Sequence, residues 1–371
     1  MTMHHVFRLS EIDQTLRTAW IRAVALLNLN ATLGPEWLDV IARTLAPGPE
    51  AVSVYVETDK ESVARAIVPF FVTNTHFYSV SLSTVQLAAN LMSYHAEIVC
   101  EDDLKDLLRR LVDRVPKWDI LQIDNVVAGS RTDHALRSLS RELGSPLQVI
   151  PGDVSPYLPI EETWETFVAR QKKRFRYNLR HRRELIQNTL GSHMAWYDAA
   201  SDMDVLLRDM LTIEKVSWKT KSGIDMASKP TEQLYYSELL PWLAKQHHLL
   251  ANVLYLEQRP IAYSLNCHFG GWVGHLKTSF DESLGHLSPG AVVIDASVQR
   301  AFEIGATEFD FLGAADAHKL AWTPFTRSHS NYFLFAPRLK PMTIGILKLL
   351  KGRLSSKYRS AGKDHISDSA G

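Results

Sequence analysis

The sequence has very little cysteine and no long hydrophobic run. Its two cysteines, Cys100 and Cys267, lie far apart among 371 residues. They support neither a disulfide framework nor a thiolate metal site, which fits a reducing compartment. No segment approaches the roughly 20 apolar residues of a membrane-spanning helix, and Met1–His5 begins no secretion signal. We therefore predict a cytoplasmic protein that does not cross a membrane.

An excess of one charge sign is also absent. Lysine and arginine total 41, and aspartate and glutamate also total 41. This balance argues against non-specific nucleic-acid binding as the main task, although a local basic patch is compatible with it. Hydrophobic residues make up 46% of the chain, which is typical of a globular protein. At about 100 to 200 residues per domain, the length suggests two domains.

Several catalytic signatures are missing. The adjacent His247 and His248 cannot both face one metal from a helix, and there is no His-Glu-x-x-His motif. A phosphate loop ending in Gly-Lys-Ser/Thr and a Gly-x-Ser-x-Gly elbow are also lacking. We therefore expect no metal site, and no metal hydrolase, nucleotidase or serine hydrolase.

The two halves of the chain show the same order of patterns. In the first half, alternation predicts strands at 52–57 and 64–72, followed by a helix from 104, a strand at 119–124, a helix at 134–143 and a strand at 147–150. In the second half, we expect helices at 164–190, 203–219 and 232–246, strands at 249–257, 261–269 and 272–280, a helix at 291–304 and a strand at 308–312.

This repetition indicates an internal duplication. The helix and strand of 104–124 match those of 291–312, and prolines interrupt the pattern at Pro151–Pro159. We predict an α/β (α+β) fold of two modules, each a mixed, mostly antiparallel sheet flanked by helices. The expected domains are 1–155 and 156–340, followed by a basic tail at 341–371.

The turn before the helix at 291–304 is the first candidate site. Ser288 can cap that helix, Pro289 suits its first turn, and Gly290 lets a ligand approach the backbone. Free N–H groups at a helix start bind phosphates, although an ordinary cap is the alternative. The candidate cofactor-binding residues are Lys277, Thr278, Ser288, Pro289, Gly290, Ala291 and Val292.

The segment after the strand at 308–312 is the second candidate site. Asp310, a following glycine, His318, Lys319 and Trp322 could form one wall of a pocket. Asp310 and Lys319 could equally be an ion pair that closes the loop.

A basic helix face and the pair Trp218-Lys219 are further candidates. Lys172, Arg176, Arg180 and Arg183 share a helix face, where like charges suggest an anionic partner: CoA phosphates, an acidic acceptor, RNA or an anionic lipid. A solvated helix is the alternative. Trp218 and Lys219 precede the loop 220–229 and suit an acceptor-binding lid, unless Trp218 belongs to the core.

The basic tail combines apolar and cationic residues at helical spacing. Ile344, Leu347 and Leu350 alternate with lysines and arginines up to Arg359. A terminal helix packed on the body is one interpretation. Peripheral contact with an anionic membrane or a partner is the other.

Taken in order, these motifs resemble the CelD-type, FemAB-related acetyltransferases of the GNAT superfamily. The similarity covers about residues 164–322 and implies tandem GNAT-like modules, the first one degenerate. The motifs that carry it are Lys172-x-Arg174-x-Arg176-x-Asn178-x-Arg180, Ser217-Trp218-Lys219, Lys277-Thr278-x-Phe280-Asp281, Ser288-Pro289-Gly290, and Asp310-Phe311-Leu312-Gly313 with Lys319 and Trp322.

The resemblance implies transfer of an acyl group, acetyl first, from acyl-CoA to an amine of a small molecule or amino sugar. The amine would attack the thioester while backbone N–H groups near 277–280 polarise its carbonyl. The implied catalytic residues are Asp281, Asp310 and Lys319, with the two aspartates as alternative bases. The implied substrate-binding residues are Arg176, Arg180, Trp218, Lys219, Phe280, His318 and Trp322.

Two other functions stay open at this point. Aminoacyl-tRNA-dependent transfer, as in the wider FemAB group, would use the basic helix to bind tRNA. A non-catalytic GNAT-like scaffold would bind no acyl-CoA.

Overall fold

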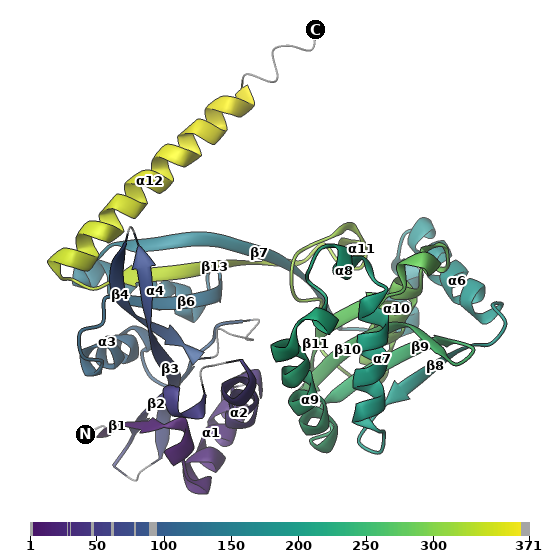
Figure 1. Ribbon diagram of the computed structural model, residues 1–371, viewed down its shortest axis with the longest axis horizontal. Helices are drawn as coiled ribbons and strands as arrows, with labels where there is room; N and C mark the ends of the chain where they lie inside the picture. The colour runs from purple at the N-terminus through teal and green to yellow at the C-terminus, as the bar shows by residue number, and fades with distance from the viewer. Residues whose placement is uncertain are drawn as a thin grey trace. The chain divides into compact units, whose positions relative to one another are not determined.

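The chain forms two compact units (Figure 1). The computed structural model describes residues 3–364 except 28, 30, 46, 47, 61, 62, 78 and 89–94. One unit comprises residues 1–35, 49–152 and 328–371, and the other comprises 36–48 and 153–327. These boundaries differ from the expected 1–155, 156–340 and 341–371. The C-terminal segment belongs to the first unit because β13 (Thr326–Phe335) pairs with β6 (Ile120–Val127).

The first unit is a mixed sheet covered by amphipathic helices. Its core joins apolar side chains of the strands to those of α3 (Leu104–Arg114) and α4 (Arg131–Leu143). Asp103 caps α3, and Gly144 ends α4 in the left-handed conformation. The strand order is β1 (Met3–Arg8), β2 (Ser53–Thr58), β3 (Ala64–Phe77), β4 (Val80–Leu87), β6 and β13, with β5 (Val99–Cys100) on β3; α1 spans Gln14–Leu26.

The second unit has helices on both faces of its sheet. On β10, Tyr263 faces α7 and hydrogen-bonds Glu214 there, whereas its neighbour Ser264 faces α10 and hydrogen-bonds Ser297. This follows from the two-residue alternation of a strand. The strand order is β7 (Leu147–Pro159), β12 (Glu308–Asp310), β11 (Trp272–Phe280), β10 (Arg259–Phe269), β9 (Leu249–Leu256) and β8 (Ser192–Tyr197); the helices are α7 (Met203–Lys215), α9 (Pro230–Lys245) and α10 (Pro289–Glu303).

The two units repeat one topology, which confirms the predicted fold class. In the first, β3 and β4 form an antiparallel hairpin, and α3 then crosses over to β6, which pairs with β4 in parallel. In the second, β10 and β11 form the hairpin, and α10 crosses over to β12, which pairs with β11 in parallel. The helix and strand that the sequence matched across the two halves occupy the same place in each unit.

Two local expectations are wrong. The segment Pro151–Pro159 continues strand β7, because an extended backbone accepts proline wherever no N–H is needed. The expected helix at 164–190 is two helices, α5 (Trp164–Arg170) and α6 (Lys173–Gln187), with Gln171 and Lys172 extended between them. The break lets Phe167 of α5 pack on Trp322 while α6 buries Leu179 and Ile186.

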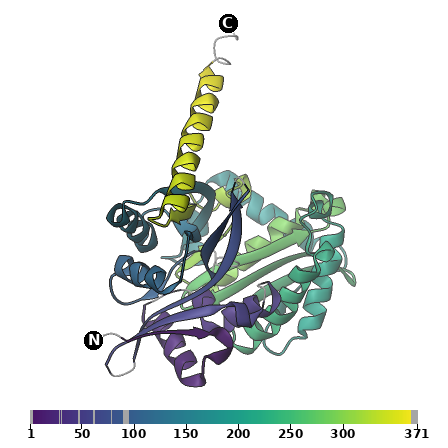
Figure 2. The ribbon, with the colours of Figure 1, turned by 60° about the vertical axis from the view of Figure 1, so that its left-hand side comes forward.

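The basic tail forms α12 (Leu339–Asp364), one long helix in both views (Figures 1 and 2). Its first turns pack on the first unit, since a Cβ at Gly345 would lie 2.8 Å from the Phe335 ring. The Lys348 ammonium lies 3.3 Å from the centroid of the Phe77 ring. Among the described residues, no helix is both long and apolar enough to cross a membrane.

Candidate functional site

The candidate site begins where β11 and β12 stop pairing. Their parallel register ends at Gly274 and Asp310. Just beyond, β11 carries a bulge, because Asn266 pairs with His275 and Leu265 with Lys277, which leaves Leu276 as an extra residue. From His275 onward, β12 therefore no longer pairs with β11, and a ligand backbone could approach this edge.

Asp310 and Lys319 hold the chain that turns away from β11. Leu312 has a φ of 46°, a left-handed conformation that costs a non-glycine residue about 1–2 kcal/mol. Asp310 Oδ1 accepts the Leu312 N–H at 2.9 Å, and Lys319 Nζ donates to the Leu312 carbonyl at 2.8 Å. The Asp310 ion pair is with Arg327 at 3.0 Å, where the sequence suggested Lys319.

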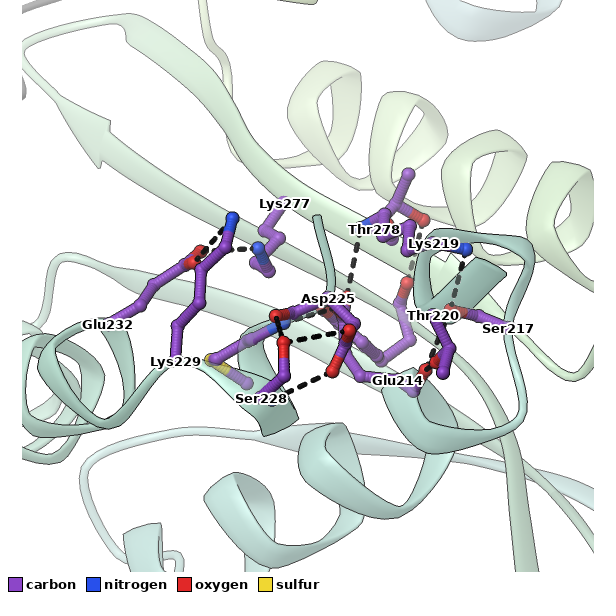
Figure 3. Close-up of polar contacts among 12 residues, drawn as sticks. Glu214, Ser217, Lys219, Thr220, Asp225, Ser228, Lys229, Glu232, Lys277 and Thr278 are labelled. Carbon is purple, nitrogen blue, oxygen red and sulfur yellow. Dashed lines mark hydrogen bonds and ion pairs between the residues drawn. The ribbon is translucent and has the colours of Figure 1, made fainter. Parts of the chain in front are cut away.

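A buried ion pair lies against the uncovered part of β11 (Figure 3). The Lys219 ammonium donates to Glu214 Oε1 at 2.9 Å and to the Thr278 carbonyl at 2.6 Å. Glu214 also accepts the Tyr263 hydroxyl at 2.6 Å and the Met226 N–H at 3.0 Å. The site thus brings together the predicted residues Lys219 and Thr278, and adds Glu214, which sequence reasoning missed.

The charges of this pair are balanced inside the protein. Burial raises the pKa of Glu214, but Lys219, Lys277 and the Tyr263 hydroxyl together outweigh that effect and hold the pKa below its ordinary value. Burial lowers the pKa of Lys219. Lys277 itself pairs with Glu232 of α9 at 2.7 Å, and its ammonium lies 5.6 Å from the centroid of the Tyr236 ring.

His275, the first residue after the last β11–β12 pair, is also a buried polar residue of the site. Burial, together with the charges of Lys319, Lys219 and His318, lowers the pKa of its imidazole to about 3. The side chain is 5% exposed and faces α10 through a polar network with Asn266. A lone histidine in a strand gives no sequence signal, so sequence reasoning missed it.

The start of α10 differs from the expected cap. Ser288 is left-handed at φ 51° and its side chain makes no capping hydrogen bond, so that prediction is wrong. The Ser288 carbonyl accepts the N–H groups of Ala291 at 3.1 Å and Val292 at 3.2 Å. Pro289 occupies the first turn as expected. At Gly290 a Cβ would lie 2.6 Å from Phe280 Cδ1, so glycine is needed there for packing.

Asp281, one of the two base candidates, is engaged in structural contacts. Its Oδ1 accepts the Ser283 N–H at 3.0 Å and the Ser283 hydroxyl at 2.6 Å. Its Oδ2 pairs with Arg259 at 3.0 Å. These contacts fix the turn that follows β11.

Trp322 and His318 lie on the α10 side of the unit. Trp322 is 3% exposed and stacks on Phe167, which makes it a core residue and not an open pocket wall. His318 Nε2 lies 3.9 Å from Asp295 Oδ1. Asp295 of α10 pairs with Arg182 at 2.7 Å, yet burial raises its pKa to about 6.

The remaining predicted residues are exposed. Arg176 of α6 donates to the Ala169 carbonyl at 2.9 Å, and Arg180 lies 3.6 Å from Glu184. Trp218 begins the short helix α8 (Trp218–Lys221) and is 43% exposed, so it is outside the core. In the described part of the chain, no three His, Cys, Asp or Glu side chains gather in a way that could hold a metal.

Comparison with known proteins places a domain over this site. Residues 173–320 match the family described as acetyltransferase (GNAT) domain. A search of curated proteins finds no match.

Two solved structures share the fold. The crystal structure of FemX superposes with a TM-score of 0.57 at 11% identity, covering 89% of this chain and 96% of that one. A conserved protein of unknown function from Bacteroides thetaiotaomicron VPI-5482 gives 0.51 at 13% identity, covering 76% and 86%. At these identities the likeness concerns the fold alone.

Proposed function

We propose that the second unit transfers an acyl group, acetyl first, from acyl-CoA to the amine of a small molecule or amino sugar. The separation of β11 from β12 at Gly274 and Asp310, inside the matched GNAT domain, carries this proposal. It leaves a bulged strand edge along which a thioester-bearing arm could lie. The turn from β11 to α10 then leads to a helix N-terminus, where phosphates are favoured.

The chemistry assigned to this edge is direct attack. The amine nitrogen forms a bond to the thioester carbonyl carbon, the C–S bond breaks, and the proton lost by nitrogen ends on the thiolate of CoA. Backbone N–H groups of the bulged segment and the ammonium groups of Lys219 and Lys319 are the positive groups near the developing oxyanion. In this proposal Asp310 is a positioning residue, because its oxygens already hold Leu312 and Arg327.

Calorimetry with acetyl-CoA and longer acyl-CoAs tests the donor. Thiol release in the presence of primary amines such as glucosamine and benzylamine then tests transfer. We expect micromolar binding of at least one acyl-CoA and amine-dependent thiol release. Absence of binding by every acyl-CoA would eliminate the proposal.

A matched pair of variants tests where the diphosphate binds. Ala291 lies in the first turn of α10 and is partly exposed. Ala291→Glu adds a negative charge that the helix N-terminus tolerates but a diphosphate does not, whereas Ala291→Gln adds the same bulk without charge. We expect acetyl-CoA affinity to fall at least tenfold more in the first variant. Equal affinities would place the diphosphate elsewhere.

Aminoacyl-tRNA-dependent transfer is the second candidate, and the surface of α6 favours it. Tyr177 is 53% exposed and stacks on His181 at 5.5 Å, next to the exposed Arg174 and Arg180. Aromatic rings beside arginines bind unpaired bases and phosphates. Arg174→Glu with Arg180→Glu should then abolish tRNA binding and leave acetyl-CoA binding unchanged. Wild-type tRNA binding that does not weaken with added salt would argue against this function.

A further inference from the structure

The hydrogen bonds around His275 determine which of its nitrogens carries the proton. The amide nitrogen of Asn266 donates to the Leu250 carbonyl at 3.0 Å and to Ser297 Oγ at 3.1 Å, which fixes the orientation of the amide. Asn266 Oδ1 must therefore be the atom that faces His275 Nδ1, at 2.8 Å. A carbonyl oxygen only accepts, so Nδ1 is protonated and Nε2 has a free lone pair.

That lone pair has no partner. Among the described residues, no group donates to His275 Nε2, although the atom is fully buried. Buried polar atoms are nearly always hydrogen-bonded, and an exception calls for a missing water or ligand or for a chemical role. The backbone of His275 follows the last paired residue of β11, so the residue stands where the strand edge becomes free, with its side chain directed into the unit toward Asn266.

We infer that His275 Nε2 accepts the N–H of the acceptor amine and positions its nitrogen, in the unprotonated form, for attack at the free edge of β11. This inference rests on the proposed function and names the form in which its acceptor binds. The acceptor is a primary amine with one N–H on His275 and its lone pair directed at the thioester carbonyl carbon. The N–C bond forms as the C–S bond breaks, and the nitrogen's proton ends on the departing thiolate.

The charges around His275 favour a neutral amine over an ammonium ion. Lys319 and Lys219 both act on the imidazole electrostatically, as does His318. The charge of Lys219 is paired with Glu214, so the repulsion of a cationic ligand comes mainly from the Lys319 ammonium, which does not repel a neutral hydrogen-bond donor. Only the neutral amine is a nucleophile, so the same charges that exclude ammonium select the reactive form.

Kinetics of His275 variants test the inference. His275→Asn keeps a donor for Asn266 but lacks the Nε2 acceptor, whereas the side-chain oxygen of His275→Gln can approach the Nε2 position. We expect His275→Asn to lower kcat/KM for the amine at least 30-fold with unchanged acetyl-CoA affinity, and His275→Gln to restore part of it. His268→Asn, on the neighbouring strand β10, is the control. An amine kcat/KM unchanged in His275→Asn would overturn the inference.

The pH profile separates positioning from proton transfer. A neutral imidazole does not titrate between about pH 5 and 9, so His275→Asn should lower kcat/KM by the same factor throughout that range. If the wild-type kcat/KM falls at acidic pH and this fall is absent in His275→Asn, then His275 titrates in that range, and the inference is contradicted.

A binding measurement keeps the inference testable if no acyl transfer is found. In ¹⁵N-labelled protein, NMR should show His275 with Nδ1 protonated and Nε2 bare. Benzylamine should shift the Nε2 resonance more strongly at pH 10 than at pH 7, because the neutral amine increases with pH. A protonated Nε2, or no shift at millimolar benzylamine, would refute it. Absence of thiol release with a normal benzylamine shift would refute only the proposed function.

Discussion

Gly290 shows how a residue can match a motif for a reason other than the expected one. The sequence suggested close approach of a ligand, but the glycine makes room for the Phe280 ring. Gly290→Ala should therefore destabilise the protein by about 1–3 kcal/mol, a cost typical of overpacking. Thermal unfolding measures this. Gly285→Ala, with nothing within 4 Å of its Cβ, is the control and should leave the melting temperature nearly unchanged.

The raised pKa of Asp295 predicts a measurable pH dependence of the free energy of unfolding. Burial raises the pKa of this carboxyl from 3.8 to about 6 in the folded protein. The folded state therefore binds the proton more tightly, and this stabilisation is complete below about pH 3.8 and is lost as the pH rises through 6. The loss is at most about 3 kcal/mol.

Asp295→Asn should remove this slope between pH 4 and 6 in urea titrations. The absolute stability can also change, because Arg182 loses its carboxylate, so the comparison uses only the shape of the curve. Glu303→Gln, at the exposed end of the same helix, is the control. An unchanged slope in Asp295→Asn would contradict the assignment.

The candidate site could be predicted from sequence only in part. Lys219, Thr278 and Lys319 stand in ordered motifs, and the structure places them near the same strand edge. Glu214 and His275 were missed because their roles depend on partners distant in sequence: Glu214 meets Tyr263, and His275 meets Asn266 and is affected by Lys319. A local pattern carries no information about such partners.

At the scale of elements, the alternation of strands and the spacing of helices predicted the bounds of a segment wherever one of its faces is buried. The strand expected at 272–280 is β11 to the residue, and the helix expected at 291–304 is α10 within two residues. The break between α5 and α6 was missed because residues 164–190 contain no proline or internal glycine to mark it. The separation of β12 from β11 could not be predicted from the sequence either, since it depends on pairing between strands.

The exposed side chains of helix α12 predict binding to an anionic membrane surface. Ile346, Leu347 and Leu350 are about half exposed and lie among lysines, a combination suited to an anionic membrane surface. We expect the protein to cosediment with phosphatidylglycerol vesicles, and Leu347→Asn with Leu350→Asn to weaken this at least fivefold. Phosphatidylcholine vesicles are the control. Equal binding to both lipids, or none, would support a tail that only packs on the body.

At the scale of the whole chain, the duplication explains why the two compact units differ from the expected domain boundaries. Each module ends in a strand that continues past the boundary of its unit: β7 crosses at residue 152 and β13 at residue 327. Its position in the sequence repeat makes β13 the last strand of the second module. Its pairing with β6 assigns residues 328–335 to the first unit.

This arrangement predicts which fragment folds alone. Residues 1–155 lack β13, so β6 loses one of its two partner strands and the first core loses Tyr332, Leu334 and Ala336. We expect that fragment to aggregate or remain unfolded, because burial of large side chains supplies about 1.5–3 kcal/mol each.

A fragment that restores β13 should fold. Gly152 lies beside His329, since a Cβ on the glycine would be 3.4 Å from the His329 carbonyl oxygen, so a short glycine-serine linker can replace residues 153–327. A second linker replaces 36–48, which belongs to the second unit and in which Trp37 packs on Trp242 of the same unit. Cooperative thermal unfolding of this fragment, but not of a matched one lacking 328–351, is the expected result. If residues 1–155 unfold just as cooperatively without β13, then that strand is not part of the first core's folding unit.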